Sequence, residues 1–432
     1  MGKDNVKLLN KANKLYNVML YKKAAKLYSS LGTSYQNLGD YETAKECFFN
    51  AAKCYLENEK FFQSIDSLRN AAGTSLFNNH FIEAFDFYKS ALNYVPNLKN
   101  SHDRYYYLLL FSCLSYLSLL IKGRQEDGLN LIKKFKNYVD DTYFKENELV
   151  KLVKDLTIAL KDKNNKYLEK IEHDFVKFKF REPENTLVKK ALVLTNTHNS
   201  LKMNLSLDKE IYTTNDLITI TLEIDTNPLI EISNHVFYNY KIEELKISKI
   251  GIKLSDNFTT QEKPVIPLIL KPGIIQNLKF KIKPHFQLEN PFIGPIFLDS
   301  ELDGNLNFYL ETSQILTPKL ISPPPTLDIS IRNLRPPLIG KTFPLEILLE
   351  NKSEGEAIDL NLELSFPEEI KVMRGTLNKQ IYSLRPNENL KWEINLKPLE
   401  AGDYIIKINL EFKDPDQNQI KESKEFPFSI KL

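Results

Sequence analysis

The amino-acid sequence predicts a multidomain α-then-β protein, in which an α-solenoid of helical hairpins is followed by two antiparallel β-sandwiches. Three observations support this fold class: a 20-residue repeat in the first hundred residues, alternation of apolar and polar residues that begins near residue 200, and a proline run at 323–325. With 432 residues, the chain is long enough for two or three domains that each bury a core.

The repeat consists of columns of similar residues spaced 20 apart. The first column is aromatic, the second, three places on, is small, and the third, seven places on, is large and apolar. In order, the columns are Tyr21, Tyr41, Phe61, Phe81; Ala24, Ala44, Ser64, Ala84; and Tyr28, Phe48, Leu68, Tyr88. Because offsets of 0, 3 and 7 lie on one face of a helix, each window predicts one amphipathic helix.

Turn-forming residues separate these helices. Gly39 suits a helix C-terminal cap, and Asp40 suits the N-cap of the next helix. Two windows of 20 residues make a hairpin of about 40, close to the tetratricopeptide repeat but longer than its 34.

The segments Gly39-Asp40-Tyr41-Glu42-Thr43-Ala44 and 81–91 resemble the tetratricopeptide-related hairpins of the soluble NSF attachment proteins. This resemblance implies an α-solenoid and, in that family, recruitment of a disassembly ATPase to a membrane-fusion complex. The chain departs from the family by continuing into β domains, so the family's partner-binding residues are not transferred to it.

Beyond residue 100 the helical pattern continues with a looser period. We expect helices near 101–122, 126–137, 144–161, 164–178 and 184–195, which gives a helical domain over 1–198. The uncharged stretch 105–121 spans about 25 Å as a helix, short of the ~30 Å of a bilayer core. We therefore expect a helix buried in the array and no transmembrane segment.

Period-two alternation then predicts strands with one buried face, for example at 217–224, 244–254 and 278–283. We place the first sandwich at 199–318, a proline-rich joint at 319–325 and the second sandwich at 326–432. The segment 340–404 resembles immunoglobulin-like modules of archaeal and bacterial proteins, and adaptor-appendage sandwiches. The domain order is similar to that of the large subunits of TRAPP-type vesicle-tethering complexes.

The composition excludes several classes of protein. Fifty-eight basic against 56 acidic residues give a net charge of +2, without the global charge of a nucleic-acid binder. The three cysteines, Cys47, Cys54 and Cys113, are too few and too clustered for a disulfide framework. With no apolar signal core near Met1, these features predict a cytoplasmic location.

The sequence predicts no catalytic, cofactor-binding or metal-binding residues. Gly340-Lys341-Thr342 resembles part of a phosphate-binding loop, but Arg335 stands where that motif needs its first glycine. The segment 414–418 resembles the start of a calcium loop, and a hairpin turn accounts for it. The six histidines lack metal-ligand spacing.

These observations favour a non-catalytic protein–protein interaction scaffold or adaptor, in a trafficking-like or membrane-associated assembly. Protein partners would bind the helical array and the sandwich edges, with no cofactor and no nucleic acid, and peripheral membrane association is compatible with this. Two alternatives stay open: an exported surface or envelope protein that uses its sandwiches for adhesion, and an enzyme whose site is assembled from distant residues.

Overall fold

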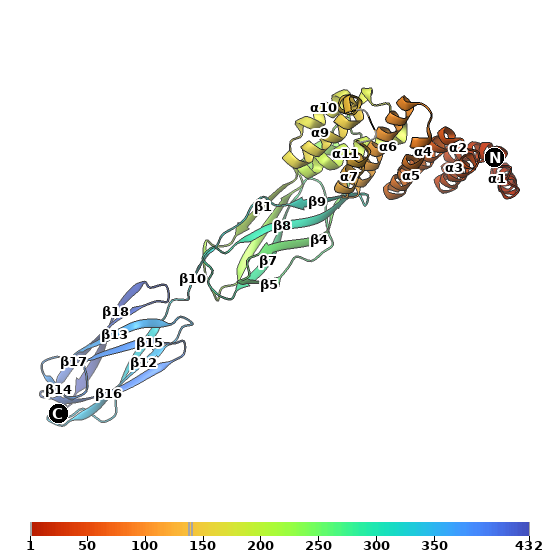
Figure 1. Ribbon diagram of the computed structural model, residues 1–432. Coiled ribbons are helices and arrows are strands. Elements are labelled where there is room, and N and C mark those ends of the chain that lie inside the picture. The colour runs from red at the N-terminus through yellow and green to blue at the C-terminus, as the bar shows by residue number, and fades with distance from the viewer. Residues whose placement is uncertain (1, 137–138, 140, 432) are drawn as a thin grey trace.

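The computed structural model describes residues 2–136, 139 and 141–431. A helical array, a first β-sandwich and a second β-sandwich follow one another along the molecule (Figure 1). The predicted α-then-β layout is confirmed.

The array begins with helices that each pack on the next along the chain. Their bounds are α1 (Gly2–Asn17), α2 (Tyr21–Asn37), α3 (Tyr41–Leu56), α4 (Phe61–Phe77), α5 (Phe81–Tyr94) and α6 (Ser101–Ile121). From α2 to α6, every helix starts 20 residues after the last, so the spacing continues one helix beyond the four windows of the repeat.

The linkers that precede α2, α3, α4 and α5 share one conformation, whereas α6 follows a 3-10 turn and an Asn100 cap. In each of these linkers, the next-to-last residue has a positive φ: 60° at Met19, 78° at Gly39, 51° at Glu59 and 59° at Asn79. The amide of the following residue then donates to a carbonyl five residues back, as from Asp40 to Tyr35 at 3.0 Å. This is the Schellman arrangement, which closes a helix and turns the chain within two residues.

The repeat columns lie where neighbouring helices meet. The second and third columns are buried throughout, whereas in the first column Phe81 is buried and the other three are half-buried. The helices approach closely: a Cβ added at Gly32 of α2 would lie 2.8 Å from the ring of Phe48 in α3.

The second half of the array is less regular. It comprises the 3-10 turn η1 (Val95–Asn97), α7 (Gln125–Lys136), α8 (Asp141–Glu146), α9 (Glu148–Asp162), α10 (Lys166–Asp174), the 3-10 turn η2 (Phe175–Lys177) and α11 (Glu182–Ser200). The helix expected at 144–161 is interrupted, because the Asn147 side chain accepts the Leu149 amide at 2.9 Å and starts a new helix. Residue 137, at the end of the helix expected at 126–137, lies outside the described residues.

Helix α6 is long and apolar enough to cross a membrane, but 78% of its most apolar window is buried inside the protein. Burial is continuous from Leu108 to Ile121. Its neighbours are α5, α7, α9 and α11, with strand β9 (Leu306–Glu311) of the first sandwich at its end.

The first sandwich has two four-stranded antiparallel sheets, ordered β1-β3-β7-β5 and β6-β4-β8-β9. Its elements are β1 (Lys202–Leu207), β2 (Ile211–Thr213), β3 (Ile218–Asp225), α12 (Pro228–Ser233), β4 (Leu245–Leu254), β5 (Phe258–Glu262), β6 (Leu268–Leu270), β7 (Ile275–Pro284), β8 (Ile293–Leu302) and β9 (Leu306–Glu311). In β3 every second residue is buried, which is the alternation that the sequence shows.

The second sandwich repeats this plan with sheets ordered β11-β12-β16-β14 and β15-β13-β17-β18. The strands are β11 (Leu327–Asn333), β12 (Phe343–Asn351), β13 (Ala357–Ser365), β14 (Ile370–Arg374), β15 (Asn378–Leu384), β16 (Asn389–Pro398), β17 (Gly402–Lys413) and β18 (Gln419–Ile430). Its core is separate from the rest, whereas one continuous core joins the array from α4 onward to the first sandwich, and α1–α3 enclose a smaller cluster of their own.

The segment between the sandwiches is ordered by contacts with both. Its first residues form β10 (Lys319–Ile321), which pairs in parallel with β2. Asp416 of the second sandwich accepts the Ser322 amide at 2.9 Å and the Gln287 side-chain amide at 2.8 Å.

Candidate functional site

The candidate site is the face of the array on which α11 lies. Helix α11 returns across the array and packs on α4, α6 and α9. We call the side of the even-numbered helices α4 and α6 that contacts α11 the inner face. An α-solenoid offers such a face to elongated partners, and here the chain's own helix occupies part of it.

A buried ion pair holds α11 to α4. Arg69 Nε donates to Glu184 Oε1 at 2.6 Å, and Arg69 Nη2 donates to Glu184 Oε2 at 2.5 Å. Only 7% of the Arg69 side chain and 2% of the Glu184 side chain are exposed. Burial by itself lowers the pKa of Arg69, but the hydrogen-bonded Glu184 carboxylate outweighs burial and raises that pKa. Arg69 therefore stays charged, and its contact with Glu184 is bidentate.

The first turn of α11 is fixed by the same carboxylate. Glu184 Oε2 also accepts the amide of Arg181 at 2.8 Å, which caps the helix N-terminus. The Arg181 side chain reaches Asp66 of α4 at 2.5 Å and also bonds Asn70. Pro183 packs over Gly73, where an added Cβ would lie 3.5 Å from the proline ring.

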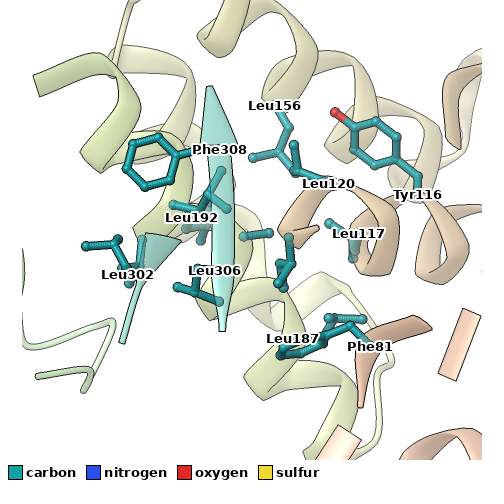
Figure 2. Packing of buried hydrophobic residues seen from close by; sticks show 14 of the residues in the cluster. Phe81, Tyr116, Leu117, Leu120, Leu156, Leu187, Leu192, Leu302, Leu306 and Phe308 are labelled. Carbon is teal, nitrogen blue, oxygen red and sulfur yellow. The ribbon is translucent and has the colours of Figure 1, made fainter. Parts of the chain in front are cut away.

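The other end of α11 joins the array to the first sandwich. Figure 2 shows Leu192 of α11 beside Leu302 and Leu306 of the β8–β9 hairpin, whereas Leu187, nearer the start of α11, lies beside Phe81 of α5. Lys122 Nζ, at the end of α6, donates to the Asn305 carbonyl at 3.0 Å and to Asn307 Oδ1 at 2.7 Å. Helix α11 thus occupies the inner face and fixes the neighbouring sandwich to it.

The expected sandwich edges are not equally open. The β9 edge is covered by α6 and α11. Strand β18 carries Pro427 and the charged residues Lys421, Glu422, Lys424 and Glu425, features that protect an edge from further pairing. Strand β15 is a more open edge, on which 84% of Tyr382 is exposed.

Several hollows adjoin the array. One, of about 270 Å³, lies between α10, α11 and α12, and its acidic lining includes Glu169, Glu172 and Glu231. Burial, together with a hydrogen bond to Glu172, raises the pKa of Tyr238 in its wall. Another, of about 410 Å³, lies between η1 and α6 and is lined by Arg104, Tyr105 and Leu108 among others.

The described residues contain no group of three or more His, Cys, Asp or Glu side chains placed to hold a metal ion. The three cysteines are buried and unbridged. Burial raises the pKa of the Cys47 thiol to about 12 and that of Cys54 to about 11, so both are protonated at neutral pH and are poor nucleophiles.

The two motifs weighed in the sequence both lie in turns. Gly340 has a φ of 70° in the turn before β12, so no helix N-terminus follows it. The segment 414–418 joins β17 to β18, and Asp414 binds its own turn through the amide and side chain of Asn418, at 2.8 and 2.9 Å.

No protein-family model matches the chain, and no curated protein matches it. Among solved structures, a cohesin module from a Clostridium perfringens family 33 glycoside hydrolase is similar to 24% of this chain, over 97% of the module. The identity is 13% and the TM-score is 0.19, so this similarity carries no argument about function.

The structure brings the repeat residues together as core, and it adds a group of residues that the sequence search did not select. Arg69 and Glu184 are 115 residues apart, so no local spacing connects them. The sequence offered two hints of this pair. Arg69 stands among small residues in α4, and Glu184 follows Pro183 directly at the start of a helix.

Proposed function

We propose that this chain is a non-catalytic protein–protein interaction scaffold or adaptor. The observation that carries the proposal is α11 itself, a helix seated on the inner face by a buried bidentate ion pair. This face therefore has the shape and the side chains to hold a helix, and it extends beyond α11 toward α2.

The finer proposal is that the array works like the tetratricopeptide-related hairpins of soluble NSF attachment proteins, in a cytoplasmic, trafficking-type assembly. The 20-residue spacing of helix starts and the order of domains support it. The β15 edge would offer a second binding surface, by strand addition.

The test is affinity purification of the full chain from cells that make it, followed by quantitative mass spectrometry. We expect a small set of proteins recovered in stoichiometric amounts and lost when the chain carries disruptive substitutions on the inner face or at the β15 edge. Recovery of no stoichiometric partner, with or without crosslinking, contradicts the proposal. Enrichment of the chain on the cell surface would instead favour adhesion through the sandwiches.

A further inference from the structure

The inner face continues from α4 onto α2. Helices α2 and α4 are both 17 residues long, start 40 residues apart and end in the same Schellman linker. A residue of α2 therefore has the same helical position as the residue 40 places later in α4.

This register identifies the residues of α2 that point to the same side as the α11 contacts of α4. Asp66, Arg69, Asn70 and Gly73 contact the start of α11. Their counterparts in α2 are Lys26, Ser29, Ser30 and Thr33, and Lys22 lies one turn before them. All of these are exposed except Ser29, which is half-buried.

The α2 stripe is basic and is not neutralised by its surroundings. Neither Lys22 nor Lys26 forms an ion pair with any residue in the part of the chain that the structure describes. Residues 1–37 contain seven lysines and one aspartate, a net charge of +6 in a chain of net charge +2, so residues 38–432 together carry −4. Positive charge is concentrated at this end of the array.

The lysines of α1 have a different explanation. Lys7, Lys11 and Lys14 are all exposed. The residues 40 places later, at the same helical positions in α3, are Cys47, Ala51 and Cys54, which pack on the side of α3 that faces α2. The three lysines therefore lie on the flank of α1 that points away from α2, where charge keeps an outer helix soluble. Lys22 and Lys26 lie on the inner face, where solubility alone does not account for them.

We propose that the inner face of α2 binds an acidic helix of another protein, with carboxylates one helical turn apart that pair with Lys22 and Lys26. This inference rests on the proposed scaffold function. A helix is the occupant because the same face already holds one on α4, through a carboxylate of its first turn. Carboxylates spaced three or four residues apart in that partner match two lysines that are themselves four residues apart. A planar membrane could contact the exposed outer flank of α1 more easily than the inner face. We therefore expect the inner-face occupant to be a helix rather than a bilayer.

The test uses the full chain and a fluorescein-labelled, alanine-rich 20-residue helical peptide with four Glu residues at i, i+4 spacing. A matched peptide carries Gln in their place. Fluorescence anisotropy measures Kd for wild type, for Lys22→Glu/Lys26→Glu and for a control of equal charge change, Lys11→Glu/Lys14→Glu. Ellipticity at 222 nm checks that each variant is folded.

We expect Lys22→Glu/Lys26→Glu to weaken binding of the Glu peptide by about tenfold or more, and the control to weaken it by no more than about twofold. A peptide with Lys in place of Glu should restore binding to Lys22→Glu/Lys26→Glu. Equal losses in both variants, equal binding of the Glu and Gln peptides, or no binding each overturn the proposal. The proposal is also overturned if the chain binds vesicles with 30% phosphatidylserine and only Lys22→Glu/Lys26→Glu abolishes that binding. The ligand of the inner face would then be a bilayer.

The scaffold function is scored separately. If purification recovers the same partners with wild type and with Lys22→Glu/Lys26→Glu, the scaffold function stands and the α2 site is wrong. If wild type recovers none, the scaffold function fails.

Discussion

Backbone conformation at single residues sets the 20-residue spacing of the helix starts from α2 to α5. Four linkers use a left-handed residue, and glycine occupies that position only at Gly39. A Cβ at Gly39 meets nothing within 4 Å, so the cost of a side chain there is purely conformational. The other three linkers bear that cost already.

We expect Gly39→Ala to lower the free energy of unfolding of the array by about 1 kcal/mol, because alanine disfavours positive φ. In the same register, Glu59→Gly should raise it by about 0.5–1 kcal/mol, whereas Glu59→Ala should leave it nearly unchanged. Urea unfolding followed at 222 nm measures all three. Equal effects of Glu59→Gly and Glu59→Ala would show that φ does not limit stability here.

Asn351 shows how a buried amide organises the second sandwich. The residue is fully buried, its Nδ2 donates to the carbonyls of Gly355 at 2.6 Å and Leu384 at 3.0 Å, and its Oδ1 accepts from Ser353. We expect Asn351→Ala to destabilise this sandwich by about 2–3 kcal/mol, since several buried groups lose their partners.

The single tryptophan of the chain, Trp392 in β16, makes this measurement local. Its fluorescence should report the loss during urea unfolding. The control Asn378→Ala, on the exposed face of β15, should change stability by no more than about 0.5 kcal/mol. A loss as large in the control as in Asn351→Ala contradicts the prediction.

At the scale of elements, α11 is held to α4 by the Arg69–Glu184 ion pair. Removing one partner of this pair lowers the stability of the array. We expect Arg69→Met to destabilise the array by about 3–5 kcal/mol, because the buried Glu184 carboxyl loses its bidentate partner. The double variant Arg69→Met/Glu184→Leu should recover most of that loss. Unfolding at 222 nm measures both, and a double variant no more stable than Arg69→Met would contradict this account.

Helix α11 also carries a pH dependence through His198 near its end. Burial lowers the pKa of His198; a hydrogen bond to Asn199 partly offsets this, and the charge of Lys163 lowers the pKa further. Because the folded-state pKa lies below the unfolded value of about 6.5, the contribution of this residue to stability is complete above pH 6.5 and is lost as pH falls through the folded-state pKa.

We therefore expect the free energy of unfolding of wild type to fall more steeply between pH 6.5 and 5 than that of His198→Gln. Urea unfolding at a series of pH values tests it, with the exposed His102→Gln as control. Parallel pH curves for wild type and His198→Gln would contradict the assignment.

The elements that the sequence predicts well are those whose signal is local. Tyr21, Ala24 and Tyr28 repeat at fixed offsets because each helix meets its neighbours in the same way. The break between α8 and α9 was missed because the apolar pattern runs through Asn147, whose side chain caps a new helix. The seating of α11 was missed because it depends on Arg69 and Glu184, which only the tertiary fold brings together.

At the scale of the whole molecule, the cores do not follow the three domains. One core joins the array from α4 onward to the first sandwich, a smaller cluster lies within α1–α3, and the second sandwich has its own core. We expect Arg69→Met to shift the 222 nm transition and leave the Trp392 transition in place, and Asn351→Ala to do the reverse. Differential scanning calorimetry should then resolve two transitions that respond separately. One transition that both variants shift equally would show that the sandwiches unfold together.

The distance along the chain between Arg69 and Glu184 has a consequence for how the protein is made. At about 5–20 residues per second, a ribosome that has synthesised Arg69 needs about 6–23 s to add the 115 residues up to Glu184. During that interval α2 to α5 can pack on one another, but the guanidinium that α11 will cover has no carboxylate. A nascent-chain chaperone that covers this face until Glu184 emerges would shield the Arg69 guanidinium during that interval, as α11 does in the folded protein.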